Sequence, residues 1–83
     1  MFFVYLLKSE KNGKHYIGQT ADIECRLQEH NNGLGKSTRN RTPFRLIGYE
    51  TFATREEARW REHNLKKSAH QRKKFIDKFI IPG

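Results

Sequence analysis

The sequence of 83 residues has little cysteine, little proline and no long apolar run. A single cysteine, Cys25, excludes an internal disulfide framework and makes a reduced compartment the expected location. No stretch of about 20 apolar residues is present, which argues against a membrane-spanning helix, and no signal-peptide pattern is visible. We therefore expect a cytoplasmic protein. The length predicts one small domain over residues 1–83 with a modest core.

Acidic side chains are also scarce, with nine Asp and Glu against seventeen Lys and Arg. Residues 1–35 carry no net charge, so the whole excess of +8 lies in residues 36–83. Such an imbalance indicates a polyanionic partner, most often nucleic acid. A basic surface without a specific partner is the alternative. An acidic membrane fits less well, because the basic residues do not lie along one long amphipathic helix.

The first part of the chain predicts a β-hairpin. An apolar run over 2–7 is typical of a strand buried on both faces. Turn residues follow over 9–13, and a return strand is expected over 15–20. Gly18 inside that strand indicates that another packed element or a ligand approaches the backbone closely.

A helix over about 22–31 is expected after the hairpin. His30 falls inside its apolar stripe, and Arg26 lies on the edge of the stripe one turn earlier. Both side chains therefore point towards the sheet. They could satisfy buried carbonyls or reach solvent along their stems. Beside a hairpin that carries Tyr5 and Tyr16, we favour a functional role.

Residues 36–43 predict a polar loop with three basic side chains and no acidic one. Its hydroxyl, amide and basic groups suit phosphate contacts, and a solvated loop is the alternative. The candidate nucleic-acid contacts here and at the start of the next strand are Lys36, Thr38, Arg39, Arg41 and Arg45.

The remaining chain predicts a third strand over 44–52 and two helices. Thr54 and Glu57 have the spacing of a capping box at the start of the first helix. The last helix turns four apolar side chains towards the core, namely Phe75, Ile76, Phe79 and Ile80. Its basic side chains are expected to point outward: Arg72, Lys73, Lys74 and Lys78.

Glu62 shares a face of the first of these helices with Ala58 and Leu65, and Trp60 lies on the opposite face. A carboxylate between apolar residues is costly unless it is paired or binds a metal ion. Pairing with a Lys or Arg is the alternative to a metal in so basic a chain.

Several kinds of chemistry are excluded. One cysteine and no zinc-type histidine spacing exclude a Cys/His metal cluster, and neither a Ser/His/Asp motif nor a Walker-type loop is present. The remaining candidates suit phosphodiester hydrolysis: Tyr5, Tyr16, Arg26, His30 and Glu62. A lone carboxylate can hold a hydrated Mg²⁺, an arginine can contact the phosphate, and a tyrosine or histidine can accept a proton. The ordinary pKa of tyrosine, about 10, would have to be lowered for that role.

The motifs Val4-Tyr5-Leu6 and Tyr16-Ile17-Gly18, with Arg26 ten residues after Tyr16, resemble the GIY-YIG nuclease superfamily. The likeness continues through His30 and Glu62, covers nearly the whole chain, and is to the small stand-alone proteins of that superfamily. The first motif reads Phe3-Val4-Tyr5 where the family name has Gly-Ile-Tyr.

The resemblance implies an α+β fold, a three-stranded antiparallel sheet flanked by helices. Its order of strand, strand, helix, strand, helix, helix is also the order that the residue patterns predict. It implies that Glu62 is the sole protein ligand of one Mg²⁺ or Mn²⁺ ion. Tyr16 would act as general base or orient the attacking water, with Tyr5 supporting it by hydrogen bonding. Arg26 would stabilise the phosphate charge, and His30 would assist by proton transfer or phosphate contact.

The leading hypothesis is therefore a metal-dependent endonuclease of DNA, with structure-selective cleavage in DNA repair or processing as its extension. RNA and a repair protein are further candidate partners. One alternative is a non-catalytic nucleic-acid-binding module of the same fold. The other is a protein-interaction adaptor that uses Trp60.

Overall fold

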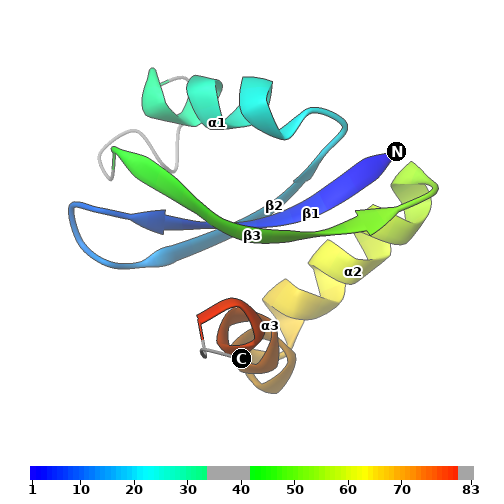
Figure 1. The fold of residues 1–83 in the computed structure, drawn as a ribbon. Helices are drawn as coiled ribbons and strands as arrows, with labels where there is room; N and C mark the ends of the chain where they lie inside the picture. The colour runs from blue at the N-terminus through cyan, green and yellow to red at the C-terminus, as the bar shows by residue number, and fades with distance from the viewer. Residues whose placement is uncertain (34–41, 81–83) are drawn as a thin grey trace.

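The computed structural model describes residues 1–33 and 42–80. Its elements are β1 (Phe2–Ser9), β2 (His15–Thr20), α1 (Ile23–Asn31), β3 (Phe44–Phe52), α2 (Arg55–Lys67) and α3 (Ala69–Ile80). Figure 1 shows the sheet between α1 on one side and α2 with α3 on the other. The predicted α+β order of strand, strand, helix, strand, helix, helix is thus confirmed.

The three strands are antiparallel, and β1 lies between β2 and β3. Its side chains alternate between two cores, as predicted for a strand that is buried on both faces. Tyr5 lies opposite Gly18 on β2 and Tyr49 on β3. At the first position of the altered GIY motif, Phe3 packs edge-to-face against Tyr49, with ring centroids 5.4 Å apart.

The glycines of the hairpin have separate roles. Gly13 has a φ of +74°, and its N–H donates to the carbonyl oxygen of Ser9 at 2.9 Å, which closes the predicted turn. At Gly18, an added Cβ would collide with the hydroxyl of Tyr5. The packed group that approaches this backbone is therefore the Tyr5 side chain, and Gly18 provides the room for it.

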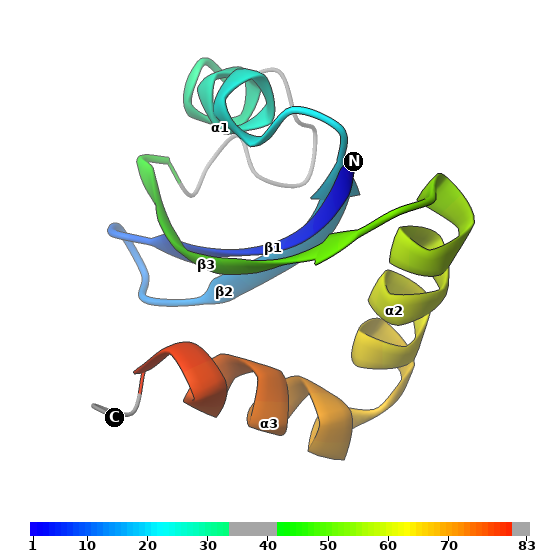
Figure 2. The same cartoon turned by 45° about the vertical axis from the view of Figure 1, so that its right-hand side comes forward.

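The face towards α2 and α3 holds an apolar core. Figure 2 shows α2 descending from the end of β3 and α3 running beneath the sheet. The buried members of this core are Val4, Leu6, Ile17, Ala58, Leu65 and Phe75. Phe2, Ile47, Phe52, Ile76 and Phe79 pack around them.

The face towards α1 holds a smaller cluster with polar groups in it. Tyr5, Leu7 and Phe44 are buried there, and Tyr16, Ile23, Leu27 and Leu46 pack around them. His30 of α1 is also buried, with 2% of its surface exposed. Three of the candidate residues, Tyr5, Tyr16 and His30, therefore lie on this face, whereas Glu62 belongs to α2.

Local capping explains where the helices begin and end. Asp22 is the N-cap of α1, since its Oδ1 accepts a hydrogen bond from the N–H of Cys25 at 3.1 Å. Gly33, with a φ of +78°, follows its C-cap. The predicted capping box of Thr54 and Glu57 opens α2. In the described part of the chain, none of the helices combines the length and apolar character needed to span a membrane.

Two predictions for α3 are wrong. Ile80, expected in the core, is 49% exposed, because the last turn of α3 packs against the apolar cluster through Phe79 and leaves Ile80 at the rim of a depression. Arg72, expected to point outward, is half-buried. Its Nη1 donates to the carbonyl oxygens of Leu65 at 3.4 Å and Lys66 at 3.2 Å. Arg72 is held inward because it satisfies carbonyls at the end of α2 that have no partner within the helix.

Candidate active site

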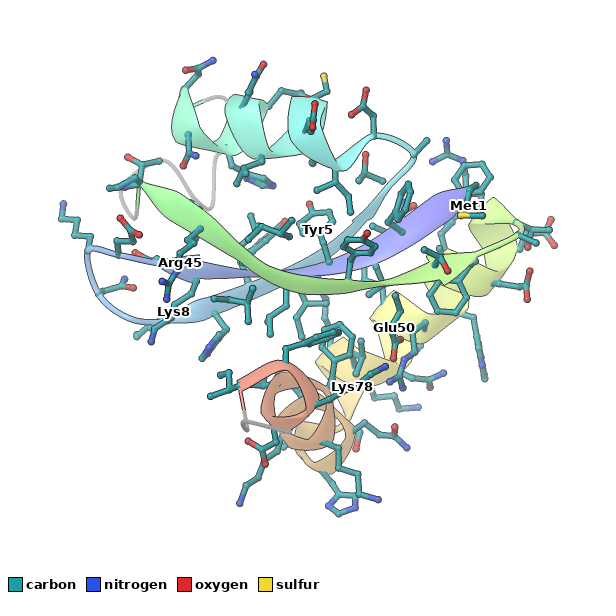
Figure 3. All side chains as sticks on the ribbon, viewed as in Figure 1. Met1, Tyr5, Lys8, Arg45, Glu50 and Lys78 are labelled. Carbon is teal, nitrogen blue, oxygen red and sulfur yellow. The ribbon has the colours of Figure 1, made fainter. Side chains whose placement is uncertain are left out.

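A buried hydrogen bond between β1 and α1 lies at the centre of the site. The hydroxyl of Tyr5 lies 3.2 Å from Nε2 of His30, and each residue is 2% exposed. The register of β1 directs Tyr5 towards α1, and the helical spacing places His30 on the buried side of α1, as predicted. Figure 3 shows Tyr5 on the α1 side of the sheet.

Tyr16 of β2 joins this pair through its ring. The ring centroids of Tyr16 and His30 are 5.0 Å apart, and those of Tyr5 and Tyr16 are 6.4 Å apart. The hydroxyl of Tyr5 lies within hydrogen-bond distance of His30, and its support of Tyr16 by hydrogen bonding stays a prediction. Both tyrosines therefore pack against the same imidazole.

Phe44 and Asn31 complete the cluster, and sequence reasoning missed both. Phe44 contacts His30 and Tyr16, with centroid distances of 6.0 and 6.5 Å. Asn31 binds the backbone of Phe44 twice: its Oδ1 accepts from the N–H at 2.6 Å, and its Nδ2 donates to the carbonyl at 3.2 Å. This amide fixes the end of α1 against β3. The Asn that directly follows His30 was the available signal.

Arg26 lies at the edge of the cluster, one turn before His30, as predicted. Its side chain is 44% exposed, and Nη1 lies 3.6 Å from Oε2 of Glu29. A side-chain hydrogen bond with Tyr5 is the main cause that raises the pKa of Arg26. The guanidinium thus adjoins the buried tyrosine and still faces solvent, where an anion can reach it.

Burial controls the protonation of the central pair. It raises the pKa of Tyr5 to about 12, although the neighbouring Arg26 acts in the opposite direction. Burial, and then the charge of Arg26, lowers the pKa of His30 below its ordinary value. At neutral pH the Tyr5 hydroxyl is therefore protonated and the imidazole is neutral, so Tyr5 can donate to Nε2 of His30.

Glu62 reaches the site from α2 through Lys66. Nζ of Lys66 lies 3.2 Å from Oε2 of Glu62 and 5.4 Å from the centroid of the Tyr16 ring. The Glu62 side chain is 24% exposed. One ammonium group therefore links the candidate metal ligand to the candidate base. Glu62 is thus paired with a basic residue, which was the alternative to a metal ion at this carboxylate.

The donor groups fit a hydrated ion better than a protein cage. The described residues contain no group of three or more His, Cys, Asp or Glu side chains that could hold a metal ion. Glu62 offers a partly exposed carboxylate that is joined to Tyr16 through Lys66. Such a carboxylate suits Mg²⁺, which keeps several waters and binds substrate phosphates. Lys66 would have to yield its place at Oε2.

Most of the predicted nucleic-acid contacts cannot be placed relative to the site. Lys36, Thr38, Arg39 and Arg41 lie outside the described residues. Arg45 is exposed, pairs with Lys8 in the register of β1 and β3, and lines a depression with Phe79 and Ile80. Figure 3 shows Arg45 and Lys8 together, away from Tyr5. As a phosphate contact, Arg45 stays a prediction.

Comparison with known proteins identifies the family of this arrangement. A model of the GIY-YIG catalytic domain matches residues 1–75. Over 75 residues the chain is 41% identical to a UPF0213 protein of Haloquadratum walsbyi, which covers 89% of this chain and 83% of that protein. Over 74 residues it is 42% identical to a UPF0213 protein of Clostridium perfringens, which covers 88% and 78% respectively.

A solved structure has the same fold. The solution NMR structure of the UPF0213 protein BH0048 from Bacillus halodurans matches with a TM-score of 0.61 and 34% sequence identity. The match covers 99% of this chain and 89% of that chain. The order of elements and the sheet are thus those of a known small protein.

Proposed function

Because the chain belongs to the GIY-YIG catalytic domain family, a family of nucleases, we propose that it is a divalent-metal-dependent endonuclease that hydrolyses DNA phosphodiester bonds. The proposal includes one Mg²⁺ or Mn²⁺ ion, selection of substrates by DNA structure, and a role in DNA repair or processing. The family supports a nucleic-acid substrate, and the net charge of +8 supports attraction to any polyanion.

The observation that carries the proposal is the convergence of the candidate residues. Tyr5, Tyr16 and His30 meet through one hydrogen bond and three ring contacts. Arg26 adjoins Tyr5, and Lys66 connects Tyr16 to Glu62. These groups come from four separate elements, which favours a selected site over the incidental packing of a lone histidine.

In this proposal the buried pair prepares the site without acting as its base. Tyr5 keeps its proton, since its pKa is raised to about 12, and it holds His30 by hydrogen bonding. His30 is neutral and packs against the ring of Tyr16. Both are therefore positioning groups, and Tyr16, at the edge of the sheet, is the group that orients or deprotonates the attacking water.

Charge stabilisation falls to the groups that face solvent. The guanidinium of Arg26 would fork onto a non-bridging phosphate oxygen. Glu62 would hold the divalent ion, which when bound neutralises charge on the phosphate and helps the leaving oxygen. Lys66 would be replaced at Glu62, so its ammonium becomes available for the substrate.

Cleavage of labelled DNA tests the proposal. The substrates are a single strand, a duplex, a flap and a branched molecule, each with Mg²⁺, Mn²⁺ or EDTA. Cutting is expected with a metal ion and should vanish in Glu62→Ala, because that variant lacks the metal ligand. Glu56→Ala is the matched control, since it removes an exposed carboxylate from the same helix.

Equal cutting by the wild type and Glu62→Ala would refute the assignment of the site. Binding of the whole panel without cutting would instead support the non-catalytic binding module. One observation favours that second candidate, because Lys66 occupies the carboxylate of Glu62 as an ordinary ion-pair partner. RNA versions of the substrates distinguish a DNA enzyme from a general nuclease.

A further inference from the structure

A cleft adjoins the site on the side of β2 that faces α2 and α3. It has a volume of about 280 Å³ and is lined by His15, Tyr16, Ile17, Lys66 and Arg72. Three of these five residues carry nitrogen donors, and none of the described residues that line the cleft has a carboxylate. This composition suits an anion, and the tyrosine that it shares with the candidate active site makes the two regions continuous.

Arg72 is fixed in this cleft with part of its donor capacity unused. Its Nη1 donates to the carbonyls of Leu65 and Lys66, which anchors the guanidinium where α2 meets α3. Among the described residues, the hydrogen bonds of the Arg72 side chain use only this one nitrogen of its fork. Nε and Nη2 therefore remain for an oxygen ligand, held by an anchored side chain.

His15 adds an unusual feature to the same wall. Its Nε2 is buried and has no hydrogen-bond partner among the described residues. Burial, followed by the charge of Lys8, lowers the pKa of His15, so the ring is neutral at neutral pH. Buried polar atoms are normally hydrogen-bonded, and one without a partner beside a basic cleft indicates that a partner arrives with a ligand.

Lys66 is the movable member of the group. Its side chain is 50% exposed, and its Glu62 partner is the carboxylate to which we assign the metal ion. A metal ion at Glu62 would displace the ammonium. Because Lys66 already lines the cleft, its displaced ammonium could pair with an anion bound there without a change in the backbone.

We propose that this cleft is a second phosphate subsite, which binds a DNA backbone phosphate next to the one that is cleaved. Lys66 and Arg72 contact its oxygens, and Nε2 of His15, in the tautomer that carries its proton there, donates the remaining hydrogen bond. The inference rests on the proposed function in taking DNA as the ligand. It goes further because it assigns His15, Lys66 and Arg72, which are not among the five candidate catalytic residues, to contacts with the DNA backbone.

Binding without divalent metal tests the subsite independently of cleavage. A 12-base-pair DNA duplex is titrated, in EDTA, into ¹⁵N-labelled protein. Amide shifts are expected at 15–17 and 65–67, and they should shrink in Lys66→Gln. The salt dependence of binding should also fall by about 1 in the slope of log K against log salt.

Lys74→Gln is the matched control, because it removes the same charge from an exposed position of α3 that does not line the cleft. The Lys74→Gln variant should keep the amide shifts at 15–17.

Arg72→Lys retains the positive charge but loses the forked guanidinium, so it should reduce these amide shifts. Shifts confined to other residues, or shifts at 15–17 that are equal in Lys66→Gln, would overturn the subsite. If these shifts appear while no substrate is cut, the subsite stands and the endonuclease proposal fails.

Discussion

The two faces of the sheet contain different kinds of packing. Towards α2 and α3, the buried side chains are apolar, from Val4 and Leu6 to Leu65 and Phe75. Towards α1, the buried groups include a tyrosine hydroxyl and an imidazole that bind each other. Both faces share β1, so alternate residues of a single strand supply the two environments.

This difference separates the source of stability from the source of chemistry. Apolar burial contributes most of the favourable free energy of folding, and it is insensitive to pH. Buried polar groups contribute little net stability, but their protonation states are controlled by the surroundings. We therefore expect changes on the α2–α3 face to alter stability first, and changes on the α1 face to alter pH dependence and activity first.

The largest effect on stability is expected from Phe75→Ala. Phe75 is 1% exposed and packs edge-to-face on Phe79, with centroids 5.1 Å apart. Truncation should lower the free energy of unfolding by about 3–5 kcal/mol. Ile80→Ala on the same helix is the control, because Ile80 is 49% exposed and should cost much less. Urea unfolding measures both, and equal losses would contradict the assignment of the core.

The second prediction concerns the tyrosine that is buried on the α1 face. Folding favours the neutral form of Tyr5, whose pKa is raised from 10 to about 12. The contribution of Tyr5 to the free energy of unfolding is therefore fully present below pH 10. It should be lost, by about 2–3 kcal/mol, as the pH rises through 10 and towards 12. Urea unfolding at rising pH should show this decrease in the wild type and lose it in Tyr5→Phe. Tyr49→Phe, at an exposed tyrosine, should behave like the wild type. An unchanged pH dependence in Tyr5→Phe would argue against a buried neutral hydroxyl.

A polar exception on the stabilising face gives the third prediction. Glu50 of β3 binds Arg61 of α2 at 2.9 Å and Lys78 of α3 at 2.8 Å. Figure 3 shows Glu50 and Lys78 close together. Burial alone would raise the pKa of Glu50, but hydrogen bonds from Arg61 and Lys78 outweigh it and lower the pKa.

Glu50→Gln should cost about 1–2 kcal/mol at neutral pH, because both cations are partly exposed and lose only part of their stabilisation. The lowered pKa means that this contribution is present above pH 4.5 and is lost as the pH falls further, through the folded-state pKa. Unfolding between pH 3 and 7 measures it. Glu56→Gln, an exposed change, should stay within about 0.5 kcal/mol. Parallel curves for wild type and Glu50→Gln below pH 4.5 would disprove the linkage.

Much of the fold could be predicted because its signals are local. The continuous apolar run of residues 2–7 indicated a strand buried on both faces, and the Thr54–Glu57 spacing located a helix start. Ile80 and Arg72 were placed wrongly for a shared reason. Helical spacing tells which residues share a face, but the extent of the sheet and the angle between helices decide what that face meets.

The candidate site divides in the same way. The burial of His30 and its position beside Tyr5 follow from the period of one helix and the alternation of one strand. The contacts of Lys66 depend on how α2 passes the edge of β2, which no local pattern encodes. The sequence indicated only that a Lys or Arg could pair with Glu62. The role of Arg72 in the cleft similarly requires the junction of α2 and α3.

The smallest predicted effect concerns that ion pair. Lys66 competes with a metal ion for Glu62, since its Nζ lies 3.2 Å from Oε2. Lys66→Gln should therefore raise the affinity for Mn²⁺ in the absence of DNA by about two- to fivefold, as expected for losing an exposed ion pair worth under about 1 kcal/mol. Line broadening of amide signals near Glu62 during a Mn²⁺ titration measures it. Lys67→Gln removes the same charge one residue away, on the face of α2 that points to solvent. An equal gain in both variants would mean that net charge alone controls metal binding, and that Lys66 does not occupy the metal position.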